Sequence, residues 1–155
     1  MEVDDNFLGP AALAKAQRFV GDSRDSQTLE RVKELSEPGG IWDCTHCGEC
    51  SERCPKPARP FERIKEIMTV ALEQGVHNNT GARHALSFFN SVKRSGNLNE
   101  NRIPVESMGI FNIPGLLSLL PIGVRMFLKG KIPPIIHHSI EEVDDVKRIF
   151  KELDK

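Results

Sequence analysis

The sequence has no tyrosine, a single tryptophan and no long apolar stretch. No apolar run reaches the roughly 18 residues that a membrane-spanning helix requires, so no transmembrane segment is expected. Neither sign of charge dominates, because 21 Lys and Arg against 22 Asp and Glu give a formal net charge of -1. This balance gives no electrostatic reason to expect a nucleic-acid partner. The acidic start, Met1-Glu2-Val3-Asp4-Asp5, is unlike a signal or transit peptide.

Signatures of catalysis and of nucleotide binding are also missing. The chain shows no nucleophile–base constellation, no paired-carboxylate signal and no Gly-rich phosphate loop. Gly9 and Gly21 flank a predicted helix as caps and do not form a dinucleotide-binding fingerprint. With 155 residues, 39% hydrophobic and 28% charged, the composition is that of an ordinary globular chain. We expect one domain, or one domain with an extension.

Apolar spacing predicts an all-α fold, since no segment shows the period-2 alternation of a strand. The predicted helices span residues 10–20, about 27–36, 60–74, about 81–95, 114–129 with a break or kink at Pro121, and a last helix from Ser139. Ser139 and Glu142 form a capping box for that helix. Residues 97–102 are predicted to be a linker, and 131–138 to be extended because of Pro133 and Pro134. Residues expected to face the core include Leu13, Val20, Val32, Leu35, Ile64, Ile67, Met68, Ala71, Phe88, Phe89, Val146 and Ile149.

All four cysteines lie in one run, Cys44, Cys47, Cys50 and Cys54, spaced C-x2-C-x2-C-x3-C and followed by Pro55. Soft thiolate ligands select iron–sulfur clusters, zinc or cuprous copper. The spacing is that of bacterial [4Fe–4S] ferredoxins, in which the fourth cysteine ligates the other cluster of a pair. Clustered thiols without a signal peptide also favour metal binding over disulfides. We predict a [4Fe–4S] cofactor; zinc is the alternative, although structural zinc usually takes two separated ligand pairs.

Histidines and cations near the cysteine run have both structural and functional interpretations. His46 could ligate, hydrogen-bond a cluster sulfide or be exposed. For His77, His84, His137 and His138 a surface or packing role is expected. A basic group near the run is either a solvated face or a set of charges that raises the cluster potential or docks an acidic partner. This group comprises Arg53, Lys56, Arg59, Arg63 and Lys65.

The apolar run 110–128 is too interrupted by Pro and Gly to span a membrane. One interpretation is core packing. The other is a docking surface for a partner or an anchor subunit, because nearly all faces of the segment are apolar.

Several of these residues together resemble a known family. The stretch Phe7-Leu8-Gly9-Pro10-Ala11-Ala12-Leu13-Ala14 is followed by Arg18-Phe19, by Asp22-Ser23-Arg24-Asp25, by Trp42 and by the cysteine run. This pattern, from Phe7 to Leu72, resembles the C-terminal helical domain of succinate dehydrogenase/fumarate reductase iron–sulfur subunits. The later segment, from Met108 to Pro134, looks more like the C-type subunits of the heterodisulfide reductase branch.

The chain departs from that family at two positions in the run. In respiratory succinate dehydrogenases the position of Cys47 is usually not cysteine and a [3Fe–4S] cluster results, so Cys47 implies a full [4Fe–4S] cluster here. Those enzymes also have a histidine directly after the first cysteine, at the quinone site. Here Thr45 occupies that place and the histidine is His46. The resemblance therefore does not assign a quinone role to His46.

The family's domain carries two cysteine runs, and the resemblance implies that the first would lie just before Phe7. It implies that Cys44, Cys47 and Cys50 hold one cluster with a cysteine from that other run, and that Cys54 completes the second cluster. The chain is accordingly expected to be the C-terminal part of a longer subunit, or to pair with a chain that supplies the rest. We divide it into 1–75, a ferredoxin-like helical cluster-binding domain, and 76–155, a helical extension that could dock a partner.

The resemblance implies an electron-relay subunit that is not catalytic alone. Its expected partners are a flavoprotein subunit, a membrane-anchor or cysteine-rich subunit, and the upstream half of the iron–sulfur subunit. The expected location is cytoplasmic and peripheral, at the inner face of a prokaryotic membrane. Two alternatives remain: a relay in a heterodisulfide reductase-type complex, and a zinc-stabilised helical interaction domain.

Overall fold

The computed structural model describes residues 5–109, 111–131, 133–134 and 137–153, and the regular elements among them are all helices. The predicted all-α class is therefore confirmed. The chain forms two compact units, Met1–Ala82 and Arg83–Lys155. The division falls in the first turn of α5, a little after the boundary at residue 75 expected from the sequence.

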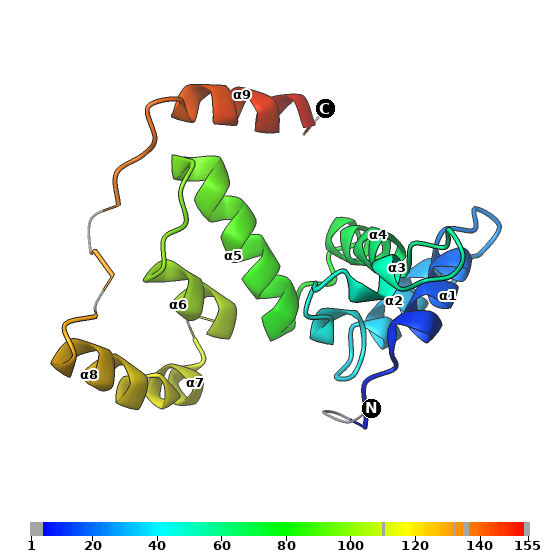
Figure 1. Cartoon of the computed structure of the whole chain (residues 1–155), viewed down its shortest axis with the longest axis horizontal. Helices are drawn as coiled ribbons and strands as arrows, with labels where there is room; N and C mark the ends of the chain where they lie inside the picture. Colours follow the sequence, from blue (N-terminus) through cyan, green and yellow to red (C-terminus); the bar gives the residue numbers. More distant parts are fainter. Residues whose placement is uncertain (1–4, 110, 132, 135–136, 154–155) are drawn as a thin grey trace. The chain divides into compact units, whose positions relative to one another are not determined.

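The first unit contains α1 (Pro10–Val20), α2 (Thr28–Leu35), the 3₁₀ helix η1 (Ile41–Asp43), α3 (Glu49–Glu52) and α4 (Pro60–Glu73) (Figure 1). The second contains the rest of α5 (Thr80–Ser95), then α6 (Arg102–Met108), α7 (Ile113–Ser118), α8 (Leu120–Leu128) and α9 (Val143–Leu153). Proline at the first turn of α1 and of α4 matches the sequence prediction, since the fixed φ of proline suits a helix start and its missing N–H would have no partner there.

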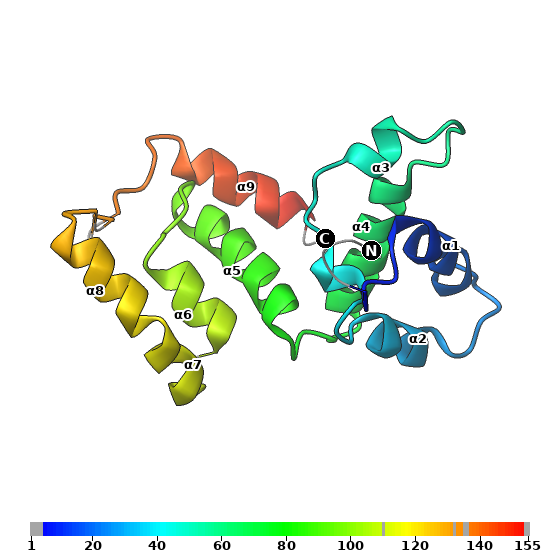
Figure 2. The same ribbon diagram turned by 60° about the horizontal axis from the view of Figure 1, so that its bottom comes forward.

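The core of the first unit lies where α1 and α4 pack together, with α2 and η1 completing it (Figure 2). The side chains with no exposed surface include Leu13 of α1, Val32 of α2, Ile41 of η1, and Ile64 and Ile67 of α4. Burying a side chain of this size stabilises the fold by about 1.5–3 kcal/mol. Because Ile41 and α4 lie on either side of the cysteine run, this core fixes both ends of the run.

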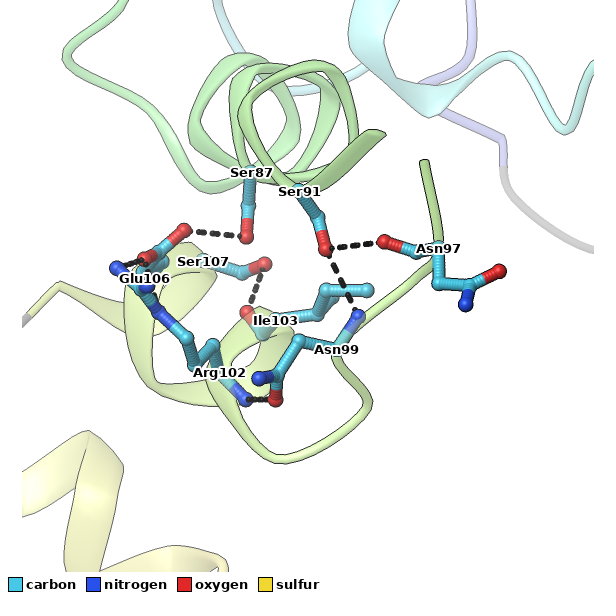
Figure 3. Close-up of polar contacts among 8 residues, drawn as sticks. All are labelled: Ser87, Ser91, Asn97, Asn99, Arg102, Ile103, Glu106 and Ser107. Carbon is cyan, nitrogen blue, oxygen red and sulfur yellow. Dashed lines mark hydrogen bonds and ion pairs between the residues drawn. The ribbon is translucent and has the colours of Figure 1, made fainter. Parts of the chain in front are cut away.

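A polar network joins α5 to α6 in the second unit (Figure 3). Ser87 is only 2% exposed, and its hydroxyl donates to Glu106 Oε2 at 2.7 Å. The other carboxylate oxygen of Glu106 accepts from Arg102 Nη2 at 2.7 Å. At the turn after α5, the Ser91 hydroxyl donates to the Asn97 carbonyl oxygen and accepts from the Asn99 backbone N–H. The two helices are thus held together by satisfied polar groups rather than by apolar contact alone.

Two short helices were not predicted, and the start of another was predicted wrongly. No helix was predicted over α6. Its proline, Pro104, is compatible with a helix because it lies in the first turn, where a backbone N–H has no helical partner. α3 was missed within the cysteine run. The last helix was expected from Ser139, but it begins at Val143. The Ile140 N–H donates to the Ser95 carbonyl oxygen at 3.0 Å, which holds this stretch against the end of α5.

Several apolar side chains expected in the core are exposed instead. Phe88 and Phe89 of α5 are 37% and 45% exposed, and Ile149 of α9 is 60% exposed. The core-packing interpretation of the 110–128 run is wrong for the residues the structure describes, because most of its large side chains lie at the surface.

The predicted interruption of this run is confirmed, since α7 ends at Ser118 and α8 begins two residues later. Among the described residues, no helix is long and apolar enough to cross a membrane.

We predict that Glu106→Ala lowers the free energy of unfolding of the chain by about 1–3 kcal/mol, because it leaves the buried Ser87 hydroxyl without its acceptor. The matched control is Arg102→Ala, which removes only the half-exposed partner on the same carboxylate and is expected to cost about 1 kcal/mol or less. Chemical denaturation followed by circular dichroism measures both losses. Equal losses in the two variants would contradict the role given to Ser87.

Candidate metal centre

The cysteine run forms a loop that begins at the end of η1 and ends before α4. Cys44 caps η1 in extended conformation, and Gly48 adopts a left-handed conformation (φ 76°) just before α3. His46 also has positive φ (57°), which is uncommon for a residue with a side chain. Two such residues within three positions turn the backbone sharply, so Cys47 lies in a tight turn, and Cys50 follows in the first turn of α3.

All four cysteines are free thiols, and they differ in exposure. Cys44, Cys50 and Cys54 are half-buried, whereas Cys47 is exposed. Burial raises the pKa of the Cys44 thiol, and the negative charges of Cys50 and Cys47 raise it further. The backbone N–H of His46 donates to the Cys44 sulfur and opposes this rise. Cys47 and Cys50 are therefore both near enough to Cys44 to act on it electrostatically.

Cys54 lies on a separate cavity of about 650 Å³ between α1 and the start of α4. Small side chains, Ala11 and Ala14, leave room on the α1 side. Three cations line the same cavity, namely Lys15, Arg18 and Arg63. The sequence pattern included Arg18 but did not place Lys15 or Arg18 beside Cys54, because that position depends on how α1 packs on α4. The Cys54 thiolate could ligate a group bound in this cavity, and the three cations would stabilise that group if its net charge is negative.

The four free thiols of the run are the candidate ligands of an iron–sulfur cluster, because soft thiolates select such clusters and the spacing is that of [4Fe–4S] proteins. Among the residues that the structure describes, no three His, Cys, Asp or Glu side chains are grouped as the ligands of one metal ion. The backbone N–H of His46 donates to the Cys44 sulfur. Hydrogen bonds to the sulfurs are one of the features that set the potential of a cluster.

The side chain of His46 lies against α4. Its Nε2 is 3.4 Å from Met68 Sδ, and its ring centroid is 5.9 Å from that of Phe61. His46 is nevertheless exposed, so of the three roles open to it from the sequence the structure favours exposure at the surface.

Ser51 joins the loop to α4. Its hydroxyl donates to Glu62 Oε2 at 2.6 Å and accepts from the Phe61 backbone N–H at 3.0 Å. The Ser51 hydrogen bond is the main cause that lowers the pKa of Glu62. This bond from a residue between the third and fourth cysteines keeps α3 on the start of α4. Nothing in the sequence marked it, because serine is common in turns.

The basic group predicted near the run is largely paired at the surface. Arg53 donates to Glu49 Oε2 at 2.6 Å, and Arg63 contacts Glu66 Oε1 at 3.0 Å. The Lys65 ammonium lies 5.5 Å from the Phe61 ring centroid. Lys56 and Arg59 are exposed. This arrangement favours a solvated face for most of the group, and Arg63 alone reaches the cavity of Cys54.

The four other histidines lie outside the cysteine loop. His84 Nδ1 is 2.9 Å from Ser107 Oγ, and its ring contacts Phe88 at 4.7 Å between centroids. His77 and His138 are exposed. His137 is half-buried, and its Nδ1 has no hydrogen-bond partner among the described residues.

Residues 10–58 match the 4Fe-4S dicluster domain family. The chain is thus an iron–sulfur protein with an electron-transfer role, and the predicted [4Fe–4S] cofactor is confirmed.

The chain is also similar to iron–sulfur subunits of known enzymes. It is 29% identical over 149 residues to the 8-methylmenaquinol:fumarate reductase iron–sulfur subunit of Wolinella succinogenes, covering 94% of the chain and 45% of that protein. It is 45% identical over 60 residues to the fumarate reductase iron–sulfur subunit of Escherichia coli, covering 39% and 25%. It is 37% identical over 70 residues to the succinate dehydrogenase iron–sulfur subunit of Coxiella burnetii, covering 45% and 30%.

These relatives confirm the resemblance to succinate dehydrogenase and fumarate reductase iron–sulfur subunits. The chain spans less than half the length of each of the three. No solved structure matches it.

We predict that iodoacetamide alkylates Cys44 of the cluster-free chain more slowly than Cys47 at neutral pH. Cys44 is half-buried and its pKa is raised, so a smaller fraction is thiolate, which is the reactive form. Raising the pH towards the pKa of Cys44 should narrow the difference. A short anaerobic pulse followed by tandem mass spectrometry gives the rates, and faster labelling of Cys44 than of Cys47 would contradict the burial described here.

Proposed function

We propose that this chain relays single electrons as the iron–sulfur component of a succinate dehydrogenase or fumarate reductase-type complex. A cluster supplies one-electron chemistry, and the protein's part is to hold it, to tune it and to exclude water. The dicluster-domain match and the three relatives support this function. The chain is proposed as a relay and not as a catalyst by itself.

The ligands divide into three and one. Cys44, Cys47 and Cys50 are assigned to one cluster and Cys54 to a second. The observation that carries this division is the separate cavity of Cys54, which α1 and α4 line with small side chains and cations. Cys47 and Cys50, in contrast, lie near enough to Cys44 for their charges to raise its pKa, which supports placing these three thiols on one cluster. A cavity between two helices is a typical place for a bound cofactor.

Each cluster then needs thiolates that this sequence does not contain. One cluster lacks a fourth thiolate and the other lacks three, because the 155 residues hold four cysteines in total. We propose that the upstream half of the iron–sulfur subunit, in the same polypeptide or in a paired chain, supplies them. The coverage of less than half of each relative is consistent with this proposal.

The proposed partners follow from the relatives. The electron donor and acceptor would be a flavoprotein subunit and a quinone site in a membrane-anchor subunit, with the complex peripheral at the cytoplasmic face of a prokaryotic membrane. The name of the Wolinella relative includes both 8-methylmenaquinol and fumarate, which supports a quinol–fumarate couple.

The second candidate is a relay to a cysteine-rich, disulfide-reducing partner, as in heterodisulfide reductase-type complexes. Its basis is the resemblance of the segment from Met108 to Pro134 to that branch. Identification of the subunits recovered with the chain from its native source would separate the two candidates.

We predict that the isolated chain, reconstituted anaerobically with iron and sulfide, holds substoichiometric or labile iron. Neither cluster has a full set of four thiolates in this chain. Iron and sulfide analysis with EPR of the reduced protein measures the content, and zinc loading of the same preparation serves as the comparison. A stable four-iron signal from the monomer would contradict the ligand division.

A further inference from the structure

Helices α7 and α8 expose most of their apolar side chains. We call this the α7–α8 surface, and we include in it Phe111, which lies just before α7. Its large exposed residues are Phe111, Ile113, Leu117, Leu120, Ile122, Val124, Met126, Phe127 and Leu128. Phe111 is 96% exposed and Leu128 is 77% exposed. Isolated exposed apolar residues are normal, but a contiguous group of this size indicates a surface that binds something.

The exposure continues around the whole of α8. Every residue from Leu120 to Lys131 is exposed, and the least exposed of its large apolar side chains, Met126, still keeps 37% of its surface accessible. An apolar groove of about 750 Å³ adds to the surface between α6 and α8, where Val105, Leu119 and Phe127 are among the lining residues. A protein partner that contacted one face of α8 would leave apolar side chains on the opposite face in water. Insertion of α8 into the apolar layer of a lipid bilayer would cover the apolar side chains of both faces.

The charges of this region have one sign only. Between Glu106 and Glu141 the sequence contains no aspartate or glutamate. It contains three cations in the same stretch, namely Arg125, Lys129 and Lys131, and all three are exposed. This is unlike the chain as a whole, in which the two signs are nearly balanced. An apolar helix with cations at its C-terminal end complements a negatively charged lipid surface.

We propose that the α7–α8 surface binds the interface of an anionic lipid bilayer. The apolar side chains insert at the boundary between headgroups and acyl chains, while Arg125, Lys129 and Lys131 reach the lipid phosphates with their flexible ends. Helices of 6 and 9 residues lie in this layer rather than span it. The inference goes beyond the electron-relay function, because it concerns the second unit whether or not the cysteine run carries a cluster.

Flotation of the full 155-residue chain with vesicles tests the proposal. We expect the chain to float with phosphatidylcholine vesicles that contain phosphatidylglycerol, and much less with phosphatidylcholine alone. Leu128→Glu should lower the bound fraction by about tenfold, since it removes one large apolar side chain from the inserted layer. The matched control is Leu153→Glu on α9, which makes the same exchange at a residue 75% exposed and should leave binding unchanged.

The charge arm of the test uses the cations. Neutralising Arg125, Lys129 and Lys131 to glutamine should lower binding to the anionic vesicles by about fivefold for each cation removed. Lys151→Gln on α9 is the control and should have little effect. Circular dichroism of each variant verifies that the helices are retained.

Three outcomes would overturn the proposal. One is the absence of flotation with anionic vesicles, and another is equal loss in Leu128→Glu and Leu153→Glu. The third is that Leu128→Glu abolishes the capture of another subunit while vesicle binding is absent, which would identify the α7–α8 surface as a protein interface. Because vesicle binding is measured independently of iron content, failure here and failure of the relay function are distinguishable.

Discussion

The packing of α1 against α4 is the contact on which the metal centre depends. Leu13 on one helix and Ile64 and Ile67 on the other have no exposed surface, and Ile41 joins the same core. The cysteine run leaves this core just after Ile41 and returns to it at α4, so its two ends are fixed by apolar burial rather than by the metal. The loop can therefore be short and sharply turned, with positive φ at His46 and Gly48.

The same packing forms the cavity on which Cys54 lies. Ala11 and Ala14 of α1 are among the small residues that line it near the start of α4. Larger residues there would fill it. The cations beside it, Lys15 and Arg18, belong to α1, which is far from the cysteines in sequence. Charges near a cluster tune the cluster's potential, so the cations of α1 would act on the potential of the cluster that we propose for this cavity.

Much of this organisation could be predicted from the sequence, for reasons that differ between elements. Pro10 and Pro60 mark helix starts and the apolar stripes mark buried faces, so the predicted bounds of α1, α2, α4 and α5 agree with the structure to within a residue or so. α6 was not predicted, although Pro104 in its first turn is compatible with a helix. The start of α9 was predicted four residues too early, because Ile140 is hydrogen-bonded to the end of α5 and the local capping box does not start the helix. Spacing alone identified the thiols, but the cavity of Cys54 and the bonds of Ser51 depend on tertiary packing.

The central claim is that one run of cysteines serves two clusters. The most direct measurement is Mössbauer and EPR spectroscopy of the assembled complex that supplies the remaining thiolates, with Cys47→Ser and Cys54→Ser compared in parallel. The account predicts that Cys47→Ser alters the signal of one cluster and leaves the other unchanged, and that Cys54→Ser does the reverse. Perturbation of the same cluster by both variants would contradict it.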